Sequence, residues 1–333
     1  MINQCLAICN NYFCTNQYSK SIRILEQVQK IDPNNEICNE LFGAIARSSL
    51  GEKDDYDRSD FFGKNWQGES LDSKKIVIFC DQGIGDTIQF LRYLPELKRR
   101  WNCEIILNCY AFFEEFQELL SDFDSIDQFV NSYTPCDYHT NILSLPSRIL
   151  DLKLEYHYPT NFEEVNKTDI PSVPYFNIKE TLSLTGGLKV GIVWSSNNKS
   201  DLNKKKSFDG NLLEELASDN FKLYSLTPTD QDFPFIEKYL GKNLRDTAIL
   251  INSMDLVVSV DTAILHLSGA LGKQTWGLLC SDADWRWGKE GNKTVWYSSV
   301  KLYRQSQKDD WSSLINLVKE DIENFSSSTY NNV

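Results

Sequence analysis

The chain has 333 residues, of which 41% are hydrophobic, and it carries a formal net charge of −13. A chain of this length can form two domains with a large core, and the hydrophobic content is typical of a globular protein. The negative charge argues against nonspecific binding of nucleic acid, because phosphates are held by lysine and arginine. Nine cysteines without C-x-x-C pairs and only three histidines disfavour a zinc site and are typical of reduced cytosolic thiols.

The sequence also limits where the protein is expected to act. No pattern of charge, apolar run and cleavage site opens the chain, so we expect no signal peptide. No run of about 18 apolar residues occurs, so we expect no transmembrane segment. The expected location is cytoplasmic, with the inner face of the membrane as an alternative.

Residues 1–51 are predicted to form a short helical segment. Its clearest helix runs from Tyr18 to Ile31, and its apolar face is expected to hold Ile22, Leu25, Val28 and Ile31. The break Asp-Pro-Asn-Asn at 32–35 and a third expected helix at 36–50 resemble about one and a half tetratricopeptide repeats. So short an array cannot bury its own face, and it is either a helical cap or a binding surface for a protein partner.

A linker is predicted over the polar residues 52–73, and the first α/β unit follows it. A strand at 76–80 leads into a tight loop with Gly83 and Gly85, which let the backbone come close to a ligand. The third glycine of a dinucleotide fingerprint is missing. One amphipathic helix is predicted over 87–100.

Asp86 stands at the start of this predicted helix. The helix dipole favours an ionised carboxylate at that position. Two interpretations remain open on local grounds, a general base acting on a hydroxyl group and a simple helix N-cap.

The prolines between residues 155 and 175 indicate a crossing between two halves. We therefore expect an N-terminal Rossmann-like domain at 74–180 and a C-terminal one at 181–325. A closing helix is predicted at 311–324, and the Ser/Asn-rich residues 326–333 are predicted to be disordered.

A polar loop follows the predicted strand at 189–194. It ends in Lys204, Lys205, Lys206 and Ser207, which form the densest basic cluster in this acidic chain. The cluster would suit a diphosphate, and the alternative is a solvated surface loop. Further along, a helix is predicted at 212–217, a strand at 221–226 and another helix at 233–240.

The stretch from Asp255 to Gly272 is the strongest site pattern. An apolar strand is followed by Asp261 and Thr262 as a helix cap and by Ala263, and such a helix start is a binding site for anions. His266 lies one turn further and can face the same point. The alternative is an ordinary β-α unit with a half-buried histidine. The pentapeptide Asp-Thr-Ala-Ile-Leu also occurs at 246–250, where we interpret it as a capped helix and not as a second site.

Several segments occur in a defined order, namely QGIGDTIQFLRYLPELK, KVGIVW, VDTAILHLSGALG and DWRW. Together they resemble the family 9 glycosyltransferases, which are lipopolysaccharide heptosyltransferase-like enzymes, and more closely the bacterial subgroup fused to tetratricopeptide repeats. The resemblance covers about residues 70–322. It implies an α/β protein with the GT-B fold, in which two Rossmann-like domains face a cleft and the C-terminal one binds the donor.

The resemblance further implies inverting transfer from a nucleotide sugar to a hydroxyl of a glycan, a lipopolysaccharide-type acceptor or a protein, with no cofactor and no required metal. Asp86 would be the base, and Gly83 and Gly85 would form the acceptor-side loop. The donor would be bound by Lys206 (or Lys205), Ser207, Asp261, Thr262, Ala263 and His266. The alternative function is a non-catalytic nucleotide-sugar or glycan-binding module whose helical segment recruits a protein.

Overall fold

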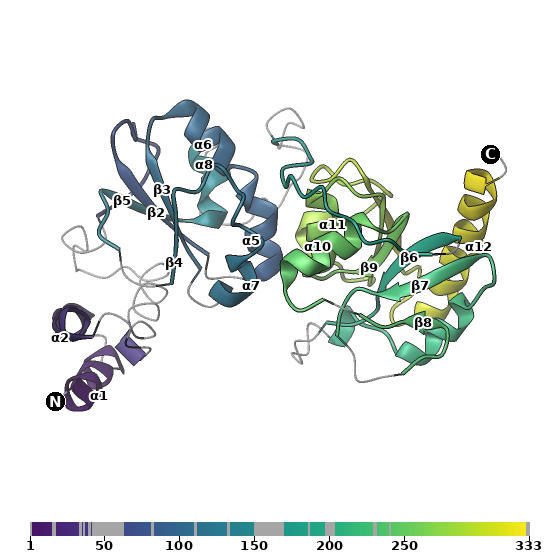
Figure 1. Cartoon of the computed structure of the whole chain (residues 1–333), viewed down its shortest axis with the longest axis horizontal. Coiled ribbons are helices and arrows are strands. Elements are labelled where there is room, and N and C mark those ends of the chain that lie inside the picture. The colour runs from purple at the N-terminus through teal and green to yellow at the C-terminus, as the bar shows by residue number, and fades with distance from the viewer. Residues whose placement is uncertain are drawn as a thin grey trace. The chain divides into compact units, whose positions relative to one another are not determined.

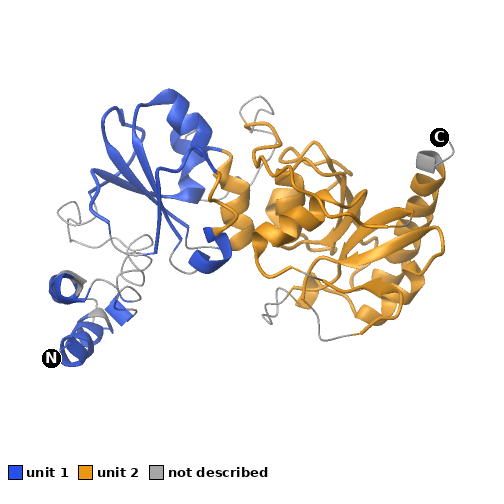
Figure 2. Cartoon of the chain, in the orientation of Figure 1, with its two compact units in different colours: residues 1–83, 93–117, 123–153 blue, residues 84–92, 118–122, 154–333 orange. Residues whose placement is uncertain are grey.

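The computed structural model describes residues 2–14, 18–32, 35, 37–38, 41, 63–80, 83–109, 112–131, 134–149, 170–185, 187–196, 204–228, 232–239 and 241–330 (Figure 1). Contacts divide the chain into two compact units (Figure 2). Unit 1 comprises Met1–Gly83, Tyr93–Gln117 and Phe123–Lys153, and unit 2 comprises Ile84–Arg92, Glu118–Asp122 and Leu154–Val333. The expected domains were divided at residue 180, whereas the main part of unit 2 begins at Leu154 and two shorter stretches, 84–92 and 118–122, also belong to it.

Unit 1 begins with the helices α1 (Ile2–Cys14) and α2 (Tyr18–Ile31). They pack through a small apolar cluster of Leu6, Cys9, Leu25, Val28 and Cys38. Leu25 and Val28 are therefore buried as expected, but Ile31 is 61% exposed, which corrects its assignment to the inner face. Most of the expected third helix lies outside the described residues, and the tetratricopeptide character stays a prediction.

The sheet of unit 1 has five parallel strands in the order β1-β5-β2-β3-β4. The strands are β1 (Lys64–Asn65), β2 (Lys75–Phe79), β3 (Glu104–Asn108), β4 (Gln128–Val130) and β5 (Tyr138–Asn141). The helical elements of this unit after α2 include α6 (Leu94–Arg100), α7 (Phe113–Gln117), η2 (Ile142–Ser144) and α8 (Leu145–Ile149). The buried apolar residues of β2 and β3 form the centre of the core.

The predicted linker is partly wrong. Residues 63–73 belong to unit 1, because β1 pairs with β5 and the side chains of Trp66 and Leu71 are fully buried. The rest of the predicted linker lies outside the described residues.

The single helix predicted over 87–100 is instead two helices, α5 (Ile84–Leu91) and α6. The chain turns at Arg92 and Tyr93, and a proline stands at the start of α6, where its missing N–H is not needed. The residues expected on the inner face, Ile88, Leu91, Leu94 and Leu97, are all buried. The turn separates them, since α5 belongs to unit 2 and α6 to unit 1.

The sheet of unit 2 has six parallel strands in the order β11-β10-β9-β6-β7-β8. The strands are β6 (Leu188–Val193), β7 (Phe221–Ser225), β8 (Ile236–Glu237), β9 (Leu256–Val260), β10 (Thr275–Leu279) and β11 (Val300–Arg304). Its other helical elements are η5 (Gly210–Leu216), α10 (Leu244–Asn252), α11 (Ala263–Ala270), η6 (Trp285–Trp287) and α12 (Trp311–Tyr330). The strand order reverses between β6 and β9, which is where sheets of this type bind ligands.

Two predictions for unit 2 are corrected. The helix expected at 233–240 is not formed, because Ile236 and Glu237 pair with β7 as the short strand β8. The tail expected to be disordered from 326 continues α12 to Tyr330. Ser326 is buried and its hydroxyl donates to the carbonyl of Asn220 at 3.2 Å, which binds this last part of the helix to the unit.

All nine cysteines fall within the described residues and are free thiols. Among the helices that the structure describes, none combines the length and the apolar character needed to cross a bilayer.

Candidate functional site

The site of unit 2 begins where β9 ends. The five residues of β9 are all buried, and Asp261 follows them with only 8% of its surface exposed. Thr262 is the N-cap of α11 in an extended conformation, but its side chain makes no capping hydrogen bond. The N–H of Leu265 already donates to the carbonyl of Thr262 at 3.1 Å, so among the described residues the N–H groups of Ala263 and Ile264 remain available to an anion.

Lys206 lies against this helix start. Its Nζ atom is 2.6 Å from Oδ2 of Asp261, and the two side chains are only 14% and 7% exposed. An ammonium group has three N–H donors, so the ion pair leaves donors for a phosphate. Ser207 accepts a hydrogen bond from the backbone of Ser196 at 3.0 Å, which holds the lysine segment at the end of β6. Lys205, the predicted substitute, is exposed.

The helix α5 packs on α11, and Gly85 makes this possible. A Cβ atom at Gly85 would lie 2.9 Å from Cδ2 of His266 and 3.5 Å from Cα of Ala263. This glycine thus allows two helices to approach, a reason different from the predicted close approach to a ligand. Gly83 precedes α5 and is grouped with unit 1.

Asp86 lies in the first turn of α5. Its Oδ1 atom accepts a hydrogen bond from Nη2 of Arg286 at 2.7 Å, and the side chains of the aspartate and the arginine are 24% and 12% exposed. Within the described part of the chain, Oδ2 of Asp86 accepts no hydrogen bond. One carboxylate oxygen is therefore anchored, and the other is open to a ligand.

Arg286 is itself tightly held by the short turn η6. The carboxylate of Asp284 accepts from the backbone N–H of Arg286 at 3.2 Å and lies 3.1 Å from its Nε atom. The indole N–H of Trp296 donates to the carbonyl of Arg286 at 3.0 Å, and the ring of Trp285 lies 5.5 Å from the guanidinium. Burial alone would lower the pKa of Arg286, but Asp86 and Asp284 outweigh it and raise the pKa.

His266 is 2% exposed and stacks on Trp287. Its Nε2 atom lies 3.4 Å from Nη1 of Arg286, and its Nδ1 atom lies 2.9 Å from the hydroxyl of Tyr297. Arginine only donates, so Nε2 is the acceptor and the proton resides on Nδ1. Burial, followed by the nearby charges of Arg286, Arg92 and Lys206, holds the pKa of His266 well below 6.5. The imidazole is therefore neutral.

Further contacts join α5 and the adjacent Arg92 to the segment that contains Tyr297. Arg92 is 1% exposed, and its Nη1 atom donates to the carbonyl of Trp296 at 2.7 Å. The Arg92 guanidinium also lies 4.8 Å from the ring of Tyr297 and 5.0 Å from the ring of Tyr175. The hydroxyl of Tyr175 in turn donates to the carbonyl of Ile88 at 2.8 Å.

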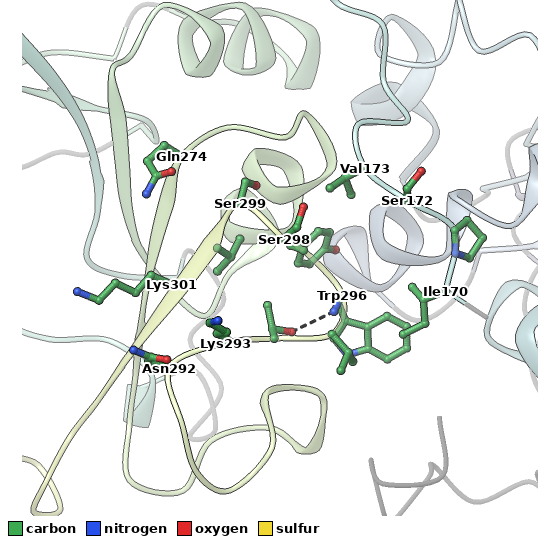
Figure 3. Close-up of a pocket in the computed structure, with 15 residues that line it drawn as sticks. Ile170, Ser172, Val173, Gln274, Asn292, Lys293, Trp296, Ser298, Ser299 and Lys301 are labelled. Carbon is green, nitrogen blue, oxygen red and sulfur yellow. Dashed lines mark hydrogen bonds between the residues drawn. The ribbon is translucent and has the colours of Figure 1, made fainter. Parts of the chain in front are cut away.

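A cavity of about 650 Å³ lies elsewhere in unit 2, and Figure 3 shows its lining residues. They come from residues 170–173, from Gln274 and from residues 292–301. Gln274 and Val300 stand at the amino ends of β10 and β11, whereas Asp261 stands at the carboxyl end of β9. Part of the lining therefore lies toward the opposite edge of the parallel sheet, and no predicted site residue belongs to it. Trp296 and Tyr297 also line the cavity, and they contact Arg286 and His266 respectively.

The structure brings most of the predicted site residues into unit 2. Arg286 contacts both Asp86 and His266, and Lys206 forms an ion pair with Asp261. No group of three or more His, Cys, Asp or Glu residues in the described ranges is arranged to hold a metal ion. Sequence reasoning missed Arg286, although it singled out the DWRW segment, and it missed Arg92 and Tyr297. The assembled groups that can contact a ligand are the carboxylate of Asp86, the shielded ammonium of Lys206 and the N-terminus of α11.

A family model described as glycosyltransferase family 9 (heptosyltransferase) matches residues 226–315. The matched segment contains β9, α11 and η6, and hence Asp261, His266 and Arg286. No curated protein sequence matches the chain.

Two solved structures from E. coli are similar in fold. Heptosyltransferase WaaC, determined with ADP-2-deoxy-2-fluoro heptose, has a TM-score of 0.50 and 12% identity, over 75% of this chain and 99% of that chain. ADP-heptose lps heptosyltransferase II has a TM-score of 0.50 and 11% identity, over 77% of this chain and 99% of that chain. At such identities the likeness shows the fold alone, and it confirms the expected GT-B fold.

The iron-containing dodecameric glycosyltransferase TibC from enterotoxigenic E. coli H10407 is also similar, with 10% identity over 78% of each chain. Its TM-score of 0.48 is too low to carry an argument about metals in this chain.

Proposed function

We propose that this chain, a glycosyltransferase of the family 9 type, transfers a sugar from a nucleotide sugar to a hydroxyl acceptor, with inversion and without a required metal. The observation that carries the proposal is the state of Asp86. Its Oδ1 atom is held by Arg286 at 2.7 Å, whereas Oδ2 accepts no hydrogen bond from the residues that the structure describes, and the side chain is 24% exposed. A carboxylate presented in this way can accept a proton from an acceptor hydroxyl.

The proposed reaction is a direct displacement. Asp86 takes the proton of the acceptor hydroxyl, and the acceptor oxygen forms a bond to the anomeric carbon. The bond between that carbon and the diphosphate breaks, and its electron pair leaves with the nucleoside diphosphate. Lys206 and the first N–H groups of α11 would stabilise the charge on the leaving diphosphate, which is the task that a metal ion performs in other transferases.

An ADP-linked heptose is the first donor to test, because the structurally similar WaaC was determined with an ADP-heptose analogue. The acceptor would be a glycan of the lipopolysaccharide type or a protein. In the second case the helices α1 and α2 would help to present it.

Replacement of the proposed base tests the mechanism. We expect Asp86→Asn to lower turnover at least about 10²-fold, because general-base catalysis contributes this much or more. Donor affinity should stay within a few-fold of that of the wild type, since the amide keeps the size of the side chain. Unchanged turnover in Asp86→Asn would remove Asp86 from the mechanism.

A thermal-shift series with nucleoside diphosphates and nucleotide sugars, without and with Mg²⁺, tests the donor site. A ligand at 100 times its dissociation constant stabilises the fold by about 2.7 kcal/mol. A selective shift that needs no Mg²⁺ supports the proposal. Binding of a donor without any turnover in the wild type would instead favour a non-catalytic binding module.

A further inference from the structure

We propose that Arg286 is a positioning residue, which joins the carboxylate of Asp86 and the imidazole of His266 into one hydrogen-bonded unit. The kinetic part of this inference depends on the proposed function, whereas the effect on His266 does not. Nothing in the residue pattern gave Arg286 a role, because its partner Asp86 is 200 residues away in the sequence.

The guanidinium of Arg286 lies close to three different side chains. Its Nη2 atom donates to Asp86 at 2.7 Å, its Nη1 atom lies 3.4 Å from His266, and its Nε atom lies 3.1 Å from Asp284. A planar guanidinium presents donors in a rigid fork, whereas a lysine ammonium is a single nitrogen on a flexible stem. Lysine therefore cannot reproduce the three contacts together.

The contacts of Arg286 hold it in place before any ligand arrives. Asp284 accepts from the backbone N–H of Arg286, and the indole N–H of Trp296 donates to its carbonyl. The side chain is 12% exposed, compared with 24% for Asp86. The arginine side chain is thus the more shielded of the two, and the aspartate side chain is the more accessible to a ligand.

The two carboxylate oxygens of Asp86 have different roles. Because Oδ1 already accepts a charged hydrogen bond from Arg286, its electron density is partly neutralised, and Oδ2 is the better acceptor for the hydroxyl proton. The arginine therefore selects the reacting oxygen and its direction. A small misplacement of a catalytic group can cost about 10²-fold in rate.

Arg286 also affects the protonation of His266. Arg286 offers only N–H donors to Nε2, so it favours the tautomer with the proton on Nδ1. The Nδ1–H group then donates to the hydroxyl of Tyr297 at 2.9 Å. The imidazole of His266, which belongs to α11, is thereby held neutral and in one orientation.

The kinetic experiment compares Arg286→Lys and Arg286→Ala in the full chain, with ADP-heptose as donor. We expect both variants to lose about 10²-fold in kcat, while the affinity for ADP stays within a few-fold. Added guanidinium or ethylguanidinium should restore part of the activity of Arg286→Ala and leave Arg286→Lys unchanged. A merely structural role would not give this selective rescue.

Arg245→Lys is the matched control. Arg245 is a partly shielded arginine of the same unit that pairs with Glu180 and Asp122 at 2.7 and 2.8 Å, and it bonds no residue of the site. We expect this variant to keep its activity and to be insensitive to guanidinium.

A second readout does not need turnover. In protein labelled with ¹⁵N-histidine, one of the three histidine spin systems should disappear in His266→Gln and so be assigned. We expect the wild type to show the proton on Nδ1, and Arg286→Ala to show a mixture of the two tautomers.

The outcomes separate the two proposals. A wild type that shows no turnover with any donor tested, but in which the tautomer changes in Arg286→Ala, would refute the proposed function and support the role of Arg286. An active wild type in which Arg286→Lys keeps full kcat and the histidine spectrum is unchanged in Arg286→Ala would overturn the role of Arg286 alone.

Discussion

The pentapeptide Asp-Thr-Ala-Ile-Leu occurs twice in unit 2, and the two copies have different environments. In the first copy it lies within α10, whose N-cap is Asn243. The carboxylate of Asp246 accepts from the backbone N–H of Lys242 at 2.8 Å. The hydroxyl of Thr247 is bonded to the carbonyl of Asn243 at 3.0 Å. The side chains of this copy thus bond the backbone at the start of their own helix, so they are not available to a ligand.

In the second copy the same residues follow the buried strand β9 instead of a capping asparagine. Asp261 therefore stands before the helix and pairs with Lys206, and Thr262 becomes an N-cap whose hydroxyl lies 3.3 Å from that of Ser259 and makes no capping hydrogen bond. The next residue is His266 in this copy, where the first copy has Ile251. The element that precedes a motif thus decides whether its aspartate completes a helix or faces a basic residue.

The largest expected difference between the copies concerns stability. Asp261→Ala should lower the free energy of unfolding by about 3 kcal/mol or more, because it leaves the shielded ammonium of Lys206 without its carboxylate. Asp246→Ala should cost about 1 kcal/mol or less, the usual effect at a helix start. Urea unfolding of both variants measures the difference, and equal losses would contradict the comparison.

A smaller effect is expected on donor binding. Lys206→Ala should weaken the binding of ADP by about 1.5–3 kcal/mol, the usual contribution of a hydrogen bond to a charged group. The exposed neighbour Lys205 is the matched control, and Lys205→Ala should change the affinity by about 1 kcal/mol at most. Isothermal titration calorimetry gives both values. An equal loss in the two variants would mean that the cluster acts only through its total charge.

The smallest expected effect is a pH dependence that His266→Ile removes by making the second copy like the first. Burial and nearby cations lower the pKa of His266 well below 6.5 in the folded protein, so the unfolded chain binds the proton first. Stability should therefore fall as the pH drops below 6.5, by about 1.4 kcal/mol per pH unit, until the folded pKa is reached. Unfolding at pH 7.5 and 5.5 should show this loss in the wild type and a smaller loss in the variant. The same loss in both would show that other groups cause it.

Sequence patterns predicted much of unit 2 because its central strands are short apolar runs. The run that ends at Asp261 predicted β9, the start of α11 and the place of His266. Lys206 was predicted from the basic cluster at 204–206 and from the family resemblance. It lies next to Asp261 because parallel strands end at one edge of the sheet, so loops that are distant in sequence come together there.

Other features left no local signal. The apolar period of Ile88, Leu91, Leu94 and Leu97 continues without interruption through the turn between α5 and α6, so the pattern conceals the break. The pairing of Asp86 with Arg286 joins residues 200 positions apart, and no spacing encodes it. The last turns of α12 contain serines with modest helix propensity, and tertiary contacts such as that of Ser326 override this preference.

The membership of α5 in unit 2 has a consequence for the synthesis of the chain. The ribosome releases α5 long before α11, so the buried residues of α5, such as Ile88 and Phe90, have no helix to cover them until the C-terminal half emerges. A gene cut between the two halves would put the helix with Asp86 on one polypeptide and the turn with Arg286 on the other. The two polypeptides would then have to complement each other through this helix before the site could form.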